Sequence, residues 1–275
     1  MPKYCLSILL LSLSSSTVFA KTAEKPFDVT PIGGMGMHNF SVAFFIFMLI
    51  SWSLWSAYKK ELRPGLLILI AASLTSWQEF YGDWGAYIYW NSEFPLLPWG
   101  ESPFTTPIKP AFLFFSWGWY FSLIYPFLLT ILNLRERYLP KIPQWPIVLF
   151  VIAPIFYAYN INGEKTAAES AWWGYAHSFG PYASAQYADY PLIWPTVTLV
   201  AFSIAIIYLL RARNSNGYWW HERLLNIDKM TAGASSGLAR IGAFVLAFNI
   251  ACLVFVTIPC IAVRLIWGVD SHLVP

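Results

Sequence analysis

The sequence predicts an all-α integral membrane protein, a bundle of about six transmembrane helices preceded by a cleaved signal peptide. Of its 275 residues, 57% are hydrophobic and 11% are charged, whereas soluble domains carry about 25% charged residues. Apolar runs close to the roughly 20 residues that a spanning helix needs recur along the chain. Lysine and arginine gather in short clusters between these runs, which indicates membrane topology rather than a nucleic-acid partner.

The first 20 residues are typical of a secretory signal peptide. They contain Lys3, then a short apolar core, and they end in the small residues of "VFA" before Lys21. This pattern predicts cleavage after Ala20, and the alternative is an uncleaved signal anchor. The predicted domains are then residues 1–20, a short extracytoplasmic segment 21–37, a six-helix transmembrane domain 38–267 and an extracytoplasmic tail 268–275.

The charged clusters orient the six predicted spanning segments. Basic residues follow the first, third and fifth segments, so the positive-inside rule places these loops in the cytoplasm and both mature termini outside. The two outer loops, 91–110 and 162–191, are rich in Pro, Gly, Trp and Tyr. We interpret them either as interfacial aromatic belts or as a lid over an outward-facing pocket. The predicted segments are His38–Tyr58, Pro64–Trp84, Lys109–Leu134, Pro143–Asn160, Pro191–Leu210 and Ile241–Trp267.

The stretch "SWQEFYGDWGAYIYW" places two carboxylates at the end of an apolar segment. Glu79 and Asp83 are four residues apart, so they project from one helix face, and Tyr87 continues that stripe. Ionisable residues within a membrane usually face the bundle interior and mark a functional site. Two close carboxylates in a poorly hydrated site do not both ionise easily, which provides an acid beside a base. The alternative is an interfacial position, where the acids are hydrated and Gly82 and Gly85 weaken the helix.

Other polar and aromatic residues are expected at a similar depth. Arg264, near the outer end of the last segment, is expected either to pair with Glu79 or Asp83 or to extend to the interface. Trp117 and Tyr120 are three residues apart and can line one face of the third segment, where aromatic walls suit an apolar substrate and stabilise cationic character. Ordinary packing is the alternative for both. The predicted catalytic residues are therefore Glu79 and Asp83, and the predicted substrate-binding residues are Tyr87, Trp117, Tyr120 and Arg264.

The sequence lacks the motifs of several cofactor-dependent or metal-dependent classes. It contains no HExxH, CxxC, GxSxG or phosphate-binding glycine loop. Cys252 and Cys260 are eight residues apart, about 12 Å along a helix, which is too far for a disulfide. We expect no cofactor and no metal, so acid–base chemistry or passage of a solute remains. The histidines form no HxxxH pair and lie in loops or at segment ends: His38, His177, His221 and His272.

The run "EFYGDWGAYIYWNSEFPLLPWGESPFTTPIKPAF", Glu79–Phe112, followed by "SWGWYF", resembles the AveC-like spirocyclase family. These are multi-spanning bacterial membrane proteins named after an enzyme of the avermectin pathway. The shared features are an acidic, aromatic helix end, an extended Pro- and Trp-rich loop, and a following aromatic helix. The resemblance implies acid-promoted closure of a dihydroxy-ketone into a spiroketal, in the bacterial inner membrane. It assigns no catalytic residues.

The predicted function is a cofactor-independent membrane cyclase or isomerase that acts on an apolar polyketide-, terpene- or lipid-like substrate. The pocket is expected near the outer leaflet, in contact with membrane lipids. Glu79 would be the acid that helps water leave, and Asp83 the base or an electrostatic stabiliser. The alternatives are a transporter, a lipid-binding accessory subunit, or a structural subunit whose acids pair with Arg264. Transporters tend to show internal repeats, and this sequence has none.

Overall fold

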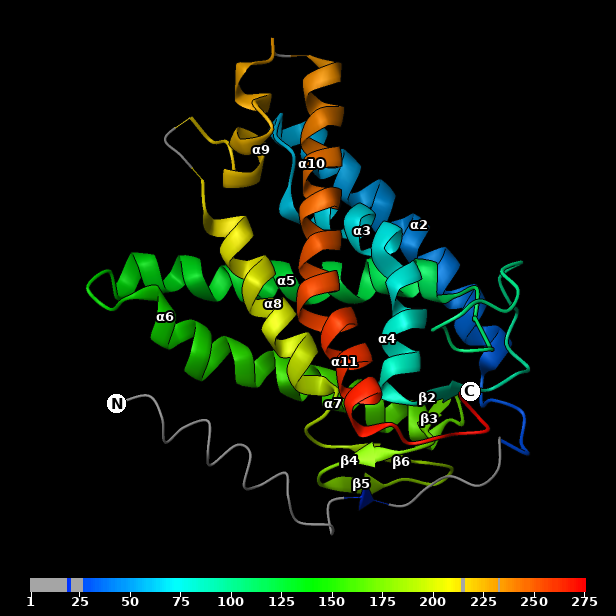
Figure 1. Ribbon diagram of the computed structural model, residues 1–275. Helices are drawn as coiled ribbons and strands as arrows, with labels where there is room; N and C mark the ends of the chain where they lie inside the picture. The colour runs from blue at the N-terminus through cyan, green and yellow to red at the C-terminus, as the bar shows by residue number, and fades with distance from the viewer. Residues whose placement is uncertain (1–18, 21–26, 214–215, 232) are drawn as a thin grey trace.

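A computed structural model describes residues 19–20, 27–213, 216–231 and 233–275. The predicted signal peptide, apart from Phe19 and Ala20, lies outside the described residues, as does Cys5. Figure 1 shows a mostly helical molecule with a small group of short strands at one end. The strands come from three places in the sequence, and they connect the ends of helices that are far apart along the chain.

Helices account for most of the described residues. Three of the helical runs contain a short non-α turn, after which the helix continues. These are a 3₁₀ turn at Ser76–Gln78 and π turns at Val148–Ile152 and Leu253–Thr257. A further 3₁₀ turn lies at Ile227–Lys229. The α-helices are α2 (Gly34–Lys59), α3 (Pro64–Thr75), α4 (Glu79–Ala86), α5 (Leu113–Tyr138), α6 (Gln144–Ile147), α7 (Ala153–Glu169), α8 (Thr196–Arg211), α9 (Trp220–Leu224), α10 (Ala234–Cys252) and α11 (Ile258–Trp267).

The strands form two-stranded antiparallel ladders. β2 pairs with β3, β1 with β4, and β5 with β6. β2 follows α4 directly and β3 follows α7, so the β2–β3 ladder ties the end of α4 to the end of α7. The strands are β1 (Phe19–Ala20), β2 (Ile88–Trp90), β3 (Trp173–Tyr175), β4 (Ser178–Phe179), β5 (Tyr182–Ser184) and β6 (Asp189–Pro191).

Four helical runs in the described part of the chain are long and apolar enough to cross a membrane. They are Gly34–Lys59, Leu113–Tyr138, Gln144–Glu169 and Ser235–Trp267, and Thr196–Arg211 is a shorter apolar helix. Their exposed side chains include many large apolar residues, such as Phe47, Ile50 and Leu54 of α2. A lipid environment accounts for this exposure, because few of these residues contact other parts of the chain.

The helix ends differ from the predicted ones in several places. The fourth segment does not end at Asn160: α7 continues to Glu169, so the start of the predicted outer loop 162–191 is helical. The third segment does not begin at Lys109, which lies in the preceding loop and donates to the carbonyls of Gly100 and Thr106 at 3.1 and 2.8 Å. A short helix, α9, lies in the loop after α8.

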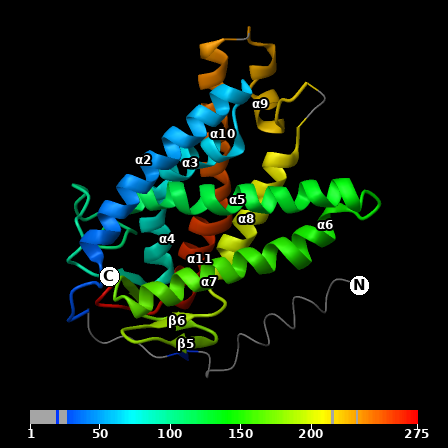
Figure 2. The ribbon, with the colours of Figure 1, turned by 180° about the vertical axis from the view of Figure 1, so that it is seen from behind.

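The helices converge on the strands at one end of the molecule. α3 packs against α5 and α10, α4 against α11, and α7 against α8. In Figures 1 and 2, the ends of α4, α7 and α11 lie beside β2 and β3. The first predicted outer loop covers this end: the Thr106 N–H donates to the Phe80 carbonyl of α4 at 3.0 Å. The arrangement brings residues of α4, α5 and α7 around one interior space.

α4 and α11 approach each other at a glycine. A Cβ atom on Gly85 would lie 2.4 Å from the Cys260 carbonyl carbon and 2.5 Å from the Ile261 nitrogen, which are backbone atoms of α11. At Gly82, one turn earlier, the nearest atom to a Cβ would be a Val256 methyl at 3.8 Å. Close backbone packing therefore requires glycine at position 85 and not at position 82. The helix continues through both glycines to Ala86.

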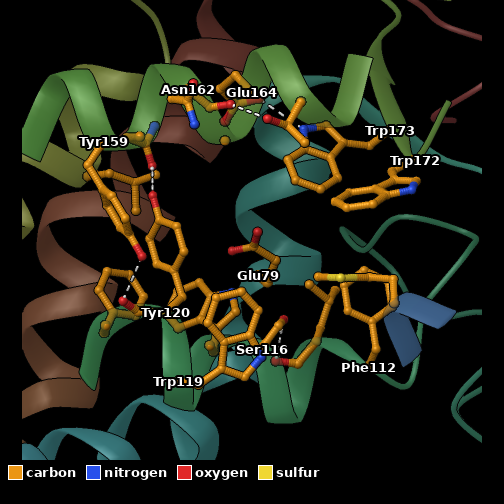
Figure 3. A pocket seen from close by; sticks show the side chains of 18 of the residues that line it. Glu79, Phe112, Ser116, Trp119, Tyr120, Tyr159, Asn162, Glu164, Trp172 and Trp173 are labelled. Atoms are coloured by element: carbon orange, nitrogen blue, oxygen red, sulfur yellow. Dashed lines mark hydrogen bonds between the residues drawn. The ribbon is translucent and has the colours of Figure 1, made fainter. Parts of the chain in front are cut away.

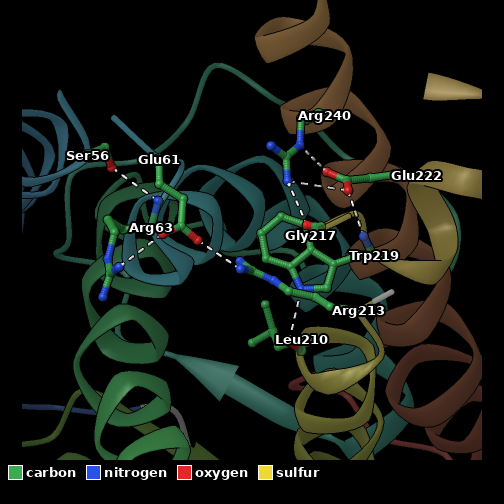
Figure 4. Close-up of polar contacts among 9 residues, drawn as sticks. All are labelled: Ser56, Glu61, Arg63, Leu210, Arg213, Gly217, Trp219, Glu222 and Arg240. Carbon is green, nitrogen blue, oxygen red and sulfur yellow. Dashed lines mark hydrogen bonds and ion pairs between the residues drawn. The ribbon is translucent and has the colours of Figure 1, made fainter. Parts of the chain in front are cut away.

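At the opposite end, charged residues from two loops and the start of α10 form one network (Figure 4). Arg240 donates to Glu222 at 2.6 Å, and Glu222 accepts the Trp219 backbone N–H at 2.7 Å. Arg213 pairs with Glu61 at 2.8 Å and lowers the pKa of that carboxyl. Glu61 and Glu222 are each paired with an arginine, so the network joins the loops after α2 and α8 to the start of α10.

His221 lies beside this network, and within the described part of the chain neither of its ring nitrogens has a hydrogen-bond partner. It is buried between the rings of Trp219 and Phe244, at centroid distances of 6.0 and 5.6 Å. Burial lowers the pKa of His221 below its ordinary value, and the nearby Arg240 charge adds to this, while Glu222 opposes it. The folded protein therefore favours neutral His221.

Gly85→Ala should destabilise the protein by at least about 1–3 kcal/mol, because the new methyl group overpacks backbone that cannot rotate away. Gly82→Ala is the matched control. It should leave stability unchanged or raise it by up to about 1 kcal/mol, since alanine favours helix over glycine. Thermal unfolding in detergent measures both. Equal melting temperatures for the two variants would contradict the close α4–α11 packing.

His221→Phe should weaken the pH dependence of stability. The unfolded chain binds a proton at His221 with a pKa of about 6.5, while the folded chain resists protonation. The stability that neutral His221 provides is therefore present above that pH and is lost as the pH falls below it, by up to about 1.4 kcal/mol per pH unit. The measurement is the melting temperature at pH 8 and pH 5. Identical pH slopes for wild type and variant would count against this role.

Candidate functional site

A cavity of about 410 Å³ lies between α2, α4, α5, α7 and α8. This volume falls within the range of about 300–1,000 Å³ that is usual for small-molecule sites. Its wall is mainly aromatic, and two carboxyl groups face it, as Figure 3 shows. The residues that line the cavity include Met37, Phe40, Glu79, Trp90, Phe112, Trp117, Trp119, Tyr120, Tyr159, Asn160, Asn162, Glu164, Thr166 and Trp173.

Glu79 is the first residue of α4, directly after the 3₁₀ turn that breaks the run from α3. The neighbouring Gln78 fixes this break. Its amide donates to the Asn249 carbonyl at 3.1 Å and accepts from the Thr257 hydroxyl at 3.0 Å. The Asn249 Oδ1 atom also accepts from the Gln78 amide at 3.0 Å and from the Trp77 indole at 3.2 Å. Glu79 is thereby turned toward the cavity and remains partly accessible.

Glu164 of α7 faces the same space from the other side (Figure 3). Its Oε2 atom accepts two hydrogen bonds at 2.9 Å, from the Trp173 indole and from the Tyr175 hydroxyl. Both donors stand on the same face of β3, two residues apart. Burial raises the pKa of Tyr175 well above its ordinary value, and the Glu164 charge adds to this, so the phenol keeps its proton and remains a donor.

Asp83 lies behind the cavity wall rather than in it. Its Oδ2 atom accepts a hydrogen bond from the Trp90 indole at 2.8 Å, and its side chain is buried. Trp90 does line the cavity. It stands directly opposite Trp173 in the β2–β3 ladder, with ring centroids 4.8 Å apart. One cross-strand tryptophan pair therefore supplies a donor to an acid on each of two helices.

The three carboxyl groups interact electrostatically and have no cation beside them. Glu79 lies within Coulombic range of both Glu164 and Asp83. Across the described residues, none of the three forms an ion pair with lysine or arginine. Their partners are neutral N–H and O–H donors, including Trp117, which donates to Glu79. Close like charges in a low-dielectric site are unfavourable, so the group is suited to sharing and moving protons.

A tyrosine–asparagine pair forms another part of the wall. The Tyr120 hydroxyl donates to Asn160 Oδ1 at 3.1 Å, and Tyr159 packs on Tyr120 with ring centroids 4.5 Å apart. This arrangement leaves the Asn160 Nδ2 group buried without a hydrogen-bond partner among the residues that the structure describes. An unsatisfied buried donor costs free energy. Since Asn160 lines the cavity, an oxygen atom of a bound molecule is its natural acceptor.

The predicted site residues fall into two groups. Glu79, Trp117 and Tyr120 line the cavity. Asp83 lies behind the wall, where it contacts the lining residue Trp90. Tyr87 and Arg264 do not line it. α4 ends at Ala86, and Tyr87 adopts a left-handed conformation (φ 61°), so the helical stripe from Glu79 does not reach it. Its hydroxyl donates to the Val269 carbonyl at 2.7 Å.

Arg264 has a structural position that the sequence did not predict. Its guanidinium donates to the Trp84 carbonyl and to the Val274 carbonyl, both at 2.6 Å. It also stacks on the rings of Trp84 and Tyr87 at 3.9 and 4.4 Å. The expected pairing with Glu79 or Asp83 is therefore replaced by capping of the α4 C-terminus, where a cation is favourable.

Glu164 was missed because the fourth segment was ended at Asn160, and Asn160 itself was not recognised as a cavity residue. The buried positions of α7 include Phe156, Asn160, Glu164 and Ala168, which recur every four residues. This spacing is the pattern of a helix face, and it continues through "NGEKTAAE" in the sequence. Glycine at position 163 suggested a loop, yet it lies within the helix, 3.9 Å from the Tyr120 hydroxyl if given a Cβ.

Within the described residues, no group of three or more His, Cys, Asp or Glu side chains has the arrangement of a metal site. Cys252 and Cys260 are buried and free, as expected from their spacing. No protein-family model, curated protein or solved structure matches the chain.

Trp90→Phe should destabilise the protein by about 1–3 kcal/mol, because it leaves the buried Asp83 carboxyl without its donor. Trp145→Phe, at an exposed position of α6, is the matched control and should change little. Adding Asp83→Asn to Trp90→Phe should recover part of the loss, since an amide is less costly than a carboxylate to bury unpaired. The melting temperatures of the wild type, Trp90→Phe, Asp83→Asn and the double variant give the coupling between positions 83 and 90. Additive effects of the two substitutions would refute it.

Proposed function

We propose that this protein is a membrane cyclase or isomerase that uses carboxyl groups for acid–base chemistry on an apolar, oxygen-bearing substrate. The observation that carries the proposal is the placement of Glu79 and Glu164 on opposite sides of one aromatic cavity. The resemblance of Glu79–Phe121 to AveC-like spirocyclases favours closure of a dihydroxy-ketone into a spiroketal. The candidate reaction needs only a proton donor, a proton acceptor and a wall that stabilises positive charge.

The two carboxyl groups have environments suited to different roles. Glu164 accepts two hydrogen bonds on one oxygen, which fix its orientation and leave the other oxygen to accept a proton, as a base requires. Glu79 receives fewer donors and faces the cavity, which suits an acid. This assignment moves the role of base from Asp83, which contacts Trp90 behind the wall, to Glu164. Asp83 then acts as a positioning residue.

The proposed ring closure balances as a loss of one water. One substrate hydroxyl adds to the ketone and forms a hemiketal. Glu79 donates a proton to the hemiketal hydroxyl, the C–O bond breaks, and water leaves an oxocarbenium carbon. The second substrate hydroxyl attacks that carbon, and Glu164 accepts its proton. A proton then returns from Glu164 to Glu79, and the electron-rich faces of Trp90, Trp117 and Trp173 stabilise the cation between these steps.

Glu79→Gln and Glu164→Gln should each lower turnover by about 10²–10⁴-fold, the usual contribution of a general acid or base. The measurement is untargeted mass spectrometry of lipids and metabolites. Cells lacking the gene are compared with cells that carry the wild type or one variant. A precursor should accumulate without the gene and in both variants, and its product should be lighter by one water or equal in mass.

Glu169→Gln is the matched control, because Glu169 ends the same helix but is exposed and pairs with Lys165 at 3.7 Å. It should retain the wild-type metabolite profile. All variants are checked for folding by thermal unfolding. If Glu79→Gln and Glu164→Gln also retain that profile, the proposal that these carboxyl groups are catalytic is wrong. A lipid-binding accessory role then becomes the better explanation.

A further inference from the structure

The cavity has a deep end and a rim that differ in chemistry. Buried residues form the deep end, among them Phe112, Trp117 and Glu164. The rim contains the exposed lining residues, which are Phe40 of α2 and Asn162 and Thr166 of α7. The cavity therefore opens between two helices rather than at a loop.

The α2 side of the rim is apolar. Phe40 is 51% exposed, stacks on Phe44 at 5.2 Å and contacts Trp119 edge-on at 5.8 Å. Beyond it, α2 presents a continuous set of exposed apolar side chains, and α2 is among the helices long and apolar enough to cross a membrane. A molecule leaving the cavity on this side stays in contact with apolar surface. The exposed set comprises Ile46, Phe47, Ile50 and Leu54.

The α7 side of the rim is polar. Asn162 and Thr166 are exposed there, and the neighbouring Lys165 forms an exposed ion pair with Glu169 at 3.7 Å. Charged and amide side chains of this kind lie in the headgroup region of a membrane rather than in hydrocarbon. One apolar and one polar edge place the opening at the boundary between hydrocarbon and headgroups.

We infer that the cavity admits single-chain amphiphiles from the membrane through this α2–α7 opening. The oxygen-bearing end enters first and reaches Glu79, Glu164 and the unpartnered Asn160 Nδ2 group. The apolar chain remains at the opening, over Phe40 and the exposed face of α2. This inference rests on the proposed function for the choice of cavity, but binding and orientation can be measured without any turnover.

The orientation predicts which residues a photoreactive probe labels. Two long-chain alcohols are used in lipid nanodiscs, one with a diazirine beside the hydroxyl and the other with a diazirine at the far end of the chain. The first should label peptides that contain Glu79 or Asn160, and the second should label the α2 peptide around Phe40. Peptide mapping by mass spectrometry reads both, and unlabelled alcohol should compete. A reversed pattern, or labelling only on the outer face of α2, overturns the inference.

Thr166→Trp tests the opening itself by placing a large side chain in it. Labelling at Glu79 and Asn160 should fall several-fold. Lys165→Trp, one residue earlier and outside the cavity lining, is the matched control and should label as the wild type does. Phe40→Ala provides a test in the opposite direction, because a wider opening should keep or raise the labelling. Equal labelling of the Thr166→Trp and Lys165→Trp proteins would overturn the proposed route.

The outcomes separate this inference from the proposed function. Labelling that follows the predicted orientation, with an unchanged metabolite profile in Glu79→Gln, supports an amphiphile site that is not catalytic. Loss of the product in Glu79→Gln, with labelling insensitive to Thr166→Trp, supports catalysis with entry by another route. The second result contradicts the α2–α7 opening and leaves the carboxyl chemistry intact.

Discussion

The hydrogen bonds from the β2–β3 ladder to buried acids are the interaction on which the rest of the site depends. Trp90 and Trp173 are cross-strand partners, and their indoles donate to Asp83 and Glu164 on two different helices. A buried carboxyl without a partner is costly, so the ladder and the acids stabilise each other. The ladder also sets the distance between the ends of α4 and α7. A three-residue strand pair thus defines the width of a cavity whose walls come from five helices.

α4 can take part in this arrangement because its two ends are fixed by other helices. At its start, Gln78 bonds to Asn249 and Thr257 around the π turn of the α10–α11 run. At its end, Arg264 of α11 caps the Trp84 carbonyl. Gly85 lets the two backbones meet between these points. The orientation of Glu79 is therefore set by the contacts at both ends of α4, which leave this helix little freedom to move.

Much of the architecture follows from apolar segments and charge clusters in the sequence. Each predicted segment contains a helix, and the Glu79, Trp117 and Tyr120 side chains meet at one cavity as the helical spacing indicates. The orientation across the membrane and the cleavage after Ala20 stay predictions. Two kinds of error have physical causes. Glu164 was missed because a glycine was read as a loop signal, although the four-residue spacing of buried positions continues past it. Arg264 was expected in the substrate site, either paired with Glu79 or Asp83 or extended to the interface, whereas the end of α4 and two aromatic rings offer it carbonyl and cation–π contacts instead.

Acidic side chains have different partners at the two ends of the molecule, and this contrast supports the proposed function of the cavity. At the α9 end, Glu222 and Glu61 are matched by Arg240 and Arg213. The cavity acids Glu79, Asp83 and Glu164 have no such cation among the described residues, although Arg264 lies on α11, the helix that packs against α4. A matching cation would stabilise the ionised acids and remove the proton that an acid catalyst needs. Neutral donors hold the carboxyl groups in place without removing their ability to exchange protons. Among the described residues no cation pairs with these carboxyl groups, and this leaves them able to hold and release the proton that the proposed acid–base role needs.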